Sequence, residues 1–128
     1  MKLRLKGSTI RLRVDRRDLE LLESHGRVVD EIRFGDQADQ QFSYVLEIGE
    51  AENALPTVDY RDGRFLIQVG AATAKDWRQN DNGAFETTRE CGGNTIRLIV
   101  EKDFACTDRP AGREEDDTFA FISPSLHC

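Results

Sequence analysis

The sequence predicts an α+β fold, a β-rich barrel or sandwich made of two ββαββ pseudo-repeats with about ten strands and two short helices. First, many short segments alternate apolar and polar residues, which is typical of half-buried strands. Second, Gly7-Ser8 and Asp62-Gly63 lie between such segments, and both dipeptides favour tight hairpin turns. Third, the two halves of the chain repeat one order of elements at a spacing of 54–55 residues. The 128 residues suffice for one compact core, so we expect a single domain spanning 1–128.

The first predicted hairpin comprises strands at 2–6 and 9–14. Leucine, isoleucine and valine occupy every second position, and cations occupy most of the positions between them. Because side chains alternate between the two faces of a strand, one face is apolar and the other is basic. Gly7-Ser8 suits a type II′ turn, which requires glycine first. The cations of the basic face are Lys2, Arg4, Lys6, Arg11 and Arg13.

A short helix is predicted at 16–25. Asp15 precedes it as an N-cap, because its carboxylate can accept the free backbone N–H groups of the first turn. His25-Gly26 provides a stop, since glycine adopts the left-handed conformation that ends many helices. Leu19 and Leu22 give the helix a short apolar face.

The remaining elements complete two similar units. Strands at 27–34 and 41–48 finish the first pseudo-repeat, which we place at 2–49. The second pseudo-repeat, at 56–103, contains predicted strands at 58–61 and 64–69, a helix at 70–78, and strands at 84–88 and 94–101. Each half exposes an apolar face that the other half can cover. A tail at 104–128 has no clear periodicity.

Charge is strongly segregated along the chain, whose net charge is −6. Residues 1–17 carry seven cations and one anion, whereas residues 18–62 carry twelve anions and three cations. Like charges on neighbouring strands repel one another, so the basic face needs compensation. Two interpretations are open: carboxylates of the acidic segment cover it, or it binds an anionic partner such as nucleic acid or a phosphorylated ligand.

Signals for catalysis and metal binding are weak. Glu101, Lys102, Asp103 and Cys106 form a candidate functional segment near the end of a predicted strand, but such a charge cluster is usually solvated surface. The cysteines and histidines lack the paired spacing of zinc sites, so we expect no metal and no cofactor. A disulfide between Cys106 and Cys128 is left open.

The location and partners follow from composition only. The chain has no apolar run of membrane-spanning length and no signal-like N-terminus, so we expect a cytoplasmic protein with no membrane partner. The partner is left open between an anionic ligand, another protein and a second copy of the chain.

Two resemblances bear on identity. Residues 1–13 (MKLRLKGSTIRLR) and 100–106 (VEKDFAC) resemble a family of short bacterial proteins of unknown function, which implies an uncharacterised bacterial protein. The basic hairpin and the helix after it, within residues 1–34, are more weakly similar to AbrB-type swapped-hairpin DNA-binding domains; Ser8 and Asp15 depart from that pattern.

These observations favour a non-enzymatic binding or interaction domain that uses its basic sheet face. The first alternative is a DNA- or RNA-binding regulator, and the second is a small enzyme whose site lies at strand ends.

Overall fold

The computed structural model describes residues 1–128 except for 52–54, 80–82, 106–118, 120 and 123–128. Its elements in chain order are β1 (Lys2–Lys6), β2 (Thr9–Val14), α1 (Arg16–His25), β3 (Arg27–Arg33), the 3-10 turn η1 (Ala38–Gln40), β4 (Gln41–Gly49), β5 (Thr57–Arg61), β6 (Arg64–Gly70), α2 (Ala71–Gln79), β7 (Ala84–Cys91), β8 (Asn94–Lys102), β9 (Phe104–Ala105) and β10 (Phe121–Ile122).

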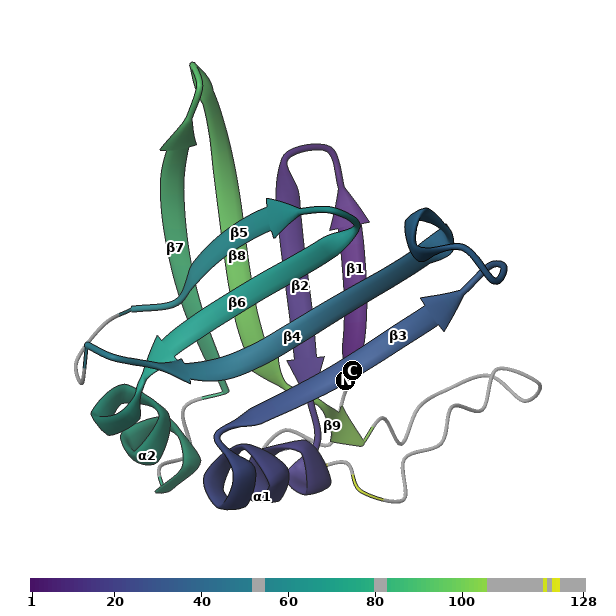
Figure 1. Cartoon of the computed structure of the whole chain (residues 1–128). Coiled ribbons are helices and arrows are strands. Elements are labelled where there is room, and N and C mark those ends of the chain that lie inside the picture. The colour runs from purple at the N-terminus through teal and green to yellow at the C-terminus, as the bar shows by residue number, and fades with distance from the viewer. Residues whose placement is uncertain (52–54, 80–82, 106–118, 120, 123–128) are drawn as a thin grey trace.

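Eight of the strands form two four-stranded sheets. The first sheet has the order β1-β2-β8-β7, and the second has the order β3-β4-β6-β5. Each consists of two antiparallel hairpins joined by one parallel pairing, β2 with β8 or β4 with β6. Both sheets are open, and in Figure 1 the second sheet crosses obliquely in front of the first. The predicted α+β fold of two ββαββ units is confirmed, without a closed barrel.

The two units exchange hairpins. The first hairpin of each unit lies in the same sheet as the last hairpin of the other unit. The pairing register repeats at the same offset of 54–55 residues: Thr9 lies opposite Arg97 in the first sheet, as Arg64 lies opposite Ser43 in the second. Hydrogen bonds repeat as well, because Arg97 N donates to Ser8 O and Ser43 N donates to Gly63 O, both at 2.9 Å. The arrangement has a pseudo-twofold symmetry.

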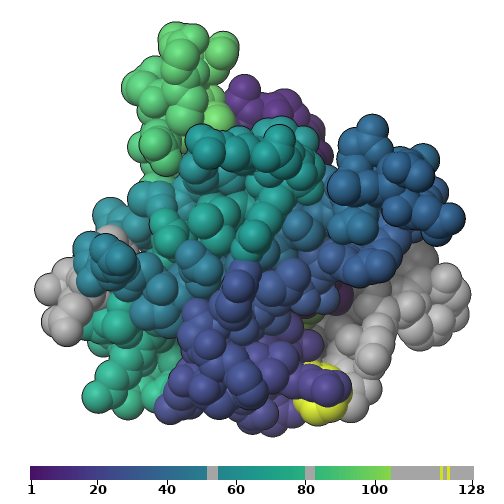
Figure 2. Space-filling model, viewed as in Figure 1, coloured from purple at the N-terminus to yellow at the C-terminus, as the bar shows by residue number. Residues whose placement is uncertain are grey.

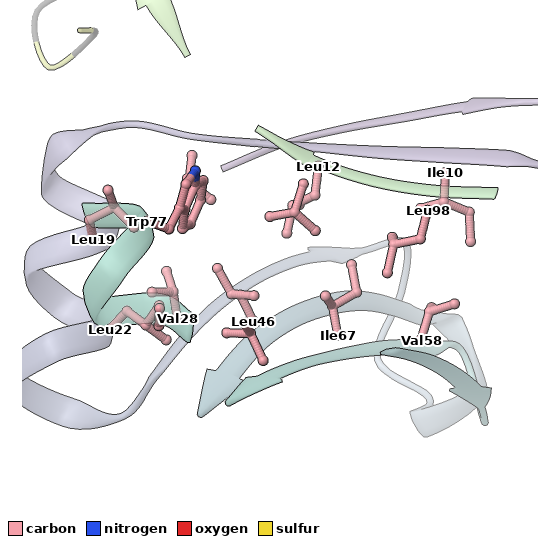
Figure 3. Close-up of a cluster of buried hydrophobic side chains, with 14 residues drawn as sticks. Ile10, Leu12, Leu19, Leu22, Val28, Leu46, Val58, Ile67, Trp77 and Leu98 are labelled. Atoms are coloured by element: carbon pink, nitrogen blue, oxygen red, sulfur yellow. The ribbon is translucent and has the colours of Figure 1, made fainter. Parts of the chain in front are cut away.

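The apolar core lies between the two sheets and is closed at one end by the helices (Figure 3). β2 and β8 contribute residues such as Leu12 and Leu98 from one side, and β4 and β6 contribute Leu46 and Ile67 from the other. Trp77 of α2 is 1 % exposed and fills the end of the core near α1. Every element of this core has its counterpart in the other unit, so neither half buries its apolar face alone.

Local chemistry explains where α1 begins and ends. Asp15 Oδ1 accepts from the backbone N–H of Asp18, and Asp18 Oδ2 accepts from that of Asp15, which together form a capping box. Gly26 ends the helix in the left-handed conformation, with φ of 76°. The predicted N-cap, helix range and stop are therefore confirmed.

The second predicted hairpin turn is also confirmed. Asp62 and Gly63 both have positive φ, as a type I′ turn requires. A Cβ atom at Gly63 would lie 2.6 Å from the backbone oxygen of Gln41, so this position excludes any side chain.

Parts of the predicted tail at 104–128 belong to the described structure. β9 and β10 pair in parallel, and the partly buried Phe121 packs against the core. Cys106, Cys128 and His127 lie outside the described residues, so the structure does not test a disulfide between the two cysteines.

Candidate functional site

The basic face is the outer surface of the β1–β2 hairpin at the edge of the first sheet. Strand register places Lys2 opposite Arg13 and Arg4 opposite Arg11, with Lys6 opposite Thr9 beside the turn. The five predicted cations therefore lie on one face, as two-residue periodicity predicts.

Carboxylates at the end of β8 neutralise the end of this face that lies away from the Gly7-Ser8 turn. Arg13 Nε donates to Glu101 Oε1 at 2.7 Å, and Arg11 Nε lies 3.5 Å from the same oxygen. Lys2 Nζ lies 2.8 Å from Asp103 Oδ2. The expectation that residues 18–62 supply these carboxylates is wrong for the ion pairs of the described residues. The parallel pairing of β2 with β8 brings Glu101 directly opposite Arg13 instead.

The turn end of the face has an excess of positive charge. Arg4 and Lys6 form no ion pair with any residue that the structure describes. Arg11 lies directly opposite Arg4, and its buried Nε has no hydrogen-bond acceptor within the described part of the chain. Glu101 already accepts from Arg13, so it compensates Arg11 only in part. Like charges directly opposite one another destabilise a strand pair.

The rest of the outer surface of the first sheet is more nearly neutral. Ile99 lies at its centre, opposite both Arg11 and Glu86, and is only 5 % exposed. Arg97 Nε donates to Glu86 Oε1 at 2.5 Å, and this hydrogen bond holds the pKa of Glu86 below its usual value. Long polar side chains therefore cover an apolar centre with their aliphatic stems.

The segment at 101–103 forms part of the sheet structure. Glu101 faces outward toward Arg13, whereas Lys102 is buried and its Nζ lies 5.1 Å from the centre of the Phe121 ring. Asp103 is 6 % exposed; its backbone N–H donates to Val14 O, and its carbonyl accepts from Phe121 N. The fourth candidate of that segment, Cys106, lies outside the described residues.

A pseudo-symmetric counterpart clarifies the role of Glu101. Glu47 occupies the corresponding position of β4, where its Oε1 accepts from Gln68 Nε2 at 2.7 Å. Gln68 in turn corresponds to Arg13. Both sheets thus carry the same cross-strand bond at their parallel seam, but only the first sheet makes it with a cation. This equivalence supports a structural role for the carboxylate.

A buried polar cluster around the N-terminal amine is absent from the predictions made from the sequence. The ammonium group of Met1 lies 2.9 Å from Asp30 Oδ2 and 3.2 Å from Asp18 Oδ2. Burial opposes its charge, but Asp30 and Asp18 outweigh that effect and raise the pKa of the amine above its usual value. Burial raises the pKa of Asp18 despite these contacts, and Tyr44 donates from its hydroxyl to Met1 O at 3.2 Å. The cluster ties β1 to α1, β3 and β4, a long-range arrangement with no local sequence signal.

A groove of about 520 Å³ between α1 and α2 is the second candidate site. Leu19, Leu22 and Ala74 form its apolar wall, and Lys75 and Arg78 lie along it. The sequence indicates the two apolar helix faces but carries no signal that a groove lies between them.

Three further findings concern metal ligands, the described cysteine and the helices. Within the described ranges, no group of three or more His, Cys, Asp or Glu side chains is arranged to hold a metal ion. Cys91, the cysteine that the structure describes, has a free thiol. None of the helices seen here is both long enough and apolar enough to cross a membrane.

Comparison with known proteins gives one match. The sequence model of a family of unknown function, DUF7009, matches residues 1–125. No curated protein and no solved structure matches the chain. The weaker likeness of residues 1–34 to AbrB-type domains therefore stays a prediction.

Proposed function

The chain belongs to the DUF7009 family of unknown function, and we propose that it is a non-enzymatic binding protein whose basic face binds an acidic segment of a partner protein. The observation that carries this proposal is the turn end of the face, where Arg4 and Lys6 form no ion pair with a described residue. Arg4 and Arg11 lie directly opposite one another, and Lys6 follows on the same strand. A partner carboxylate between these cations would turn a repulsive arrangement into an attractive one.

The size of the charge excess favours a protein partner over nucleic acid. Proteins that bind duplex DNA commonly neutralise about 6–10 phosphates. The basic face offers only Arg4, Lys6 and the partly compensated Arg11, in a chain whose net charge is −6. The outer surface of the first sheet also presents no aromatic ring among its described residues on which a base could stack. A short acidic peptide segment matches this number of charges.

The test uses fluorescence anisotropy with a labelled ten-residue glutamate peptide at low ionic strength. We expect Arg4→Gln combined with Lys6→Gln to weaken binding about tenfold, since each exposed ion pair contributes roughly 0.2–1 kcal/mol. The matched control is Arg61→Gln combined with Arg64→Gln. These two arginines flank the turn of the β5–β6 hairpin, the counterpart of the β1–β2 hairpin in the second sheet, and lie opposite each other. Removing the same charge there should leave the affinity within about twofold of wild type.

A labelled duplex of twelve base pairs distinguishes the regulator alternative. We plot the logarithm of the binding constant against the logarithm of the salt concentration. A slope near −3 means that about three phosphates are contacted, as the basic face allows. A slope of about −6 or steeper would overturn the proposal in favour of a nucleic-acid-binding function. Failure of the glutamate peptide to bind, or equal weakening by both double variants, would also overturn it.

A further inference from the structure

The groove between α1 and α2 is made by two matching helix faces. Residues 19, 22, 23 and 26 on α1 and its cap, and residues 71, 74, 75 and 78 on α2, line it. Each set has the spacing i, i+3, i+4, i+7, which places its members on one side of a helix. In Figure 2, α2 (green) and α1 (dark blue) lie side by side at the lower end of the molecule. The groove thus runs along both helices for about 10 Å, at 1.5 Å per residue.

One position of the second helix leaves room beside the first, because it carries a smaller side chain than its counterpart there. Ala74 corresponds to Leu19 at the repeat spacing, and Ala71 lies one turn before it. Leu19 and Leu22 are 4 % and 3 % exposed, so they lie at the base of the groove and present only their outermost atoms to it. A volume of about 520 Å³ lies within the range that small-molecule sites commonly have. The space suits a slender aliphatic group.

The charges along the groove favour an anionic head on that ligand. Arg78 forms an ion pair with Glu23 that joins the two helices. Lys75, one helical turn earlier on the same face, forms no ion pair with another described residue. The lining charges therefore leave one cation uncompensated beside an apolar wall.

We propose that this groove binds a free amphipathic carboxylate of the medium-chain fatty-acid class. The alkyl chain lies against Leu19, Leu22 and Ala74, and the carboxylate pairs with Lys75 beside Arg78. Glu23 competes with the ligand carboxylate for Arg78, so it lowers the affinity of the groove for the ligand. This site is separate from the basic face: it is lined by the helices, whereas the basic face lies on β1 and β2.

The test is an NMR titration of the isotope-labelled full chain with octanoate. We expect amide shifts in α1 and α2. We also expect weaker binding of octanol, which has no charge, and of octylammonium, whose charge is reversed. Lys75→Gln should weaken the binding of octanoate about two- to fivefold, as expected for the loss of one exposed ion pair. Glu23→Gln should strengthen the binding of octanoate. Ala71→Leu should fill the groove and abolish binding; Ala71 is exposed, so the fold should tolerate it, and circular dichroism checks this.

Several results would overturn the proposal. These are octanoate shifts outside the two helices, no binding by octanoate, equal binding of octylammonium, or unchanged binding in both Ala71→Leu and Lys75→Gln. The variant with Arg4→Gln and Lys6→Gln should bind octanoate like wild type. Loss of peptide binding on the basic face therefore leaves this inference intact, and loss of octanoate binding leaves the other proposal intact.

Discussion

The two corresponding carboxylates at the parallel seams allow a matched test of how the basic face is compensated. Glu101→Gln removes a charge whose oxygen lies 2.7 Å from Arg13 Nε and 3.5 Å from Arg11 Nε. Hydrogen bonds that involve a charged group contribute roughly 1.5–3 kcal/mol. Arg13 is 40 % exposed and the remaining amide can still accept, so screening by solvent reduces the expected loss to about 1–2 kcal/mol.

Glu47→Gln is the control, because its partner Gln68 is neutral. We expect it to lower the free energy of unfolding by less than about 1 kcal/mol, with little dependence on salt. The assay is urea denaturation of both variants at low and high NaCl. The loss in Glu101→Gln should change with salt, because the arginines it leaves unpaired repel one another and salt screens that repulsion. An equal, salt-independent loss in the two variants would refute the electrostatic reasoning.

Three further predictions concern the core, the helix cap and the N-terminal amine. Leu46→Ala should destabilise the protein by about 2–5 kcal/mol in urea denaturation, because Leu46 is fully buried between the sheets, whereas the exposed Leu21→Ala should cost less than about 0.5 kcal/mol. Gly26→Ala should cost about 1 kcal/mol through its positive φ alone, since no atom lies within 4 Å of the added Cβ; an unchanged thermal midpoint would contradict this. Folding raises the pKa of the Met1 amine, so the stability that its ion pairs contribute should be fully present below about pH 8. That stability should be lost as the pH rises through the raised pKa of the folded protein, because the deprotonated amine no longer pairs with the carboxylates. Asp30→Asn should reduce this loss, and an identical pH profile in that variant would exclude the proposed cause.

The parts of the fold that depend on local chemistry could be predicted from the sequence. Asp15 and Gly26 mark the ends of α1 because capping involves neighbouring residues. Asp62-Gly63 predicts its turn because few other dipeptides accept positive φ at both positions. The repeat spacing predicted two similar units, and the same spacing appears in the strand register.

The long-range pairings could not be predicted in the same way. The alternation in β2 shows which side chains face outward but not that β8 lies beside it. From the sequence, Glu101 is a candidate for chemistry, and the acidic segment at 18–62 is expected to cover the basic face. The parallel seam overturns the second expectation, because it brings Glu101 beside Arg13, and Arg4 and Lys6 form no ion pair with any described residue.

The most direct measurement of the central claim is an NMR map of where the ten-residue glutamate peptide binds on the isotope-labelled chain. Binding at the turn end of the basic face predicts that the largest amide shifts fall on Arg4, Lys6 and Arg11, with smaller shifts at Arg97 across the sheet. Shifts centred on the second sheet or on the helices, with the β1–β2 hairpin unchanged, would contradict the claim.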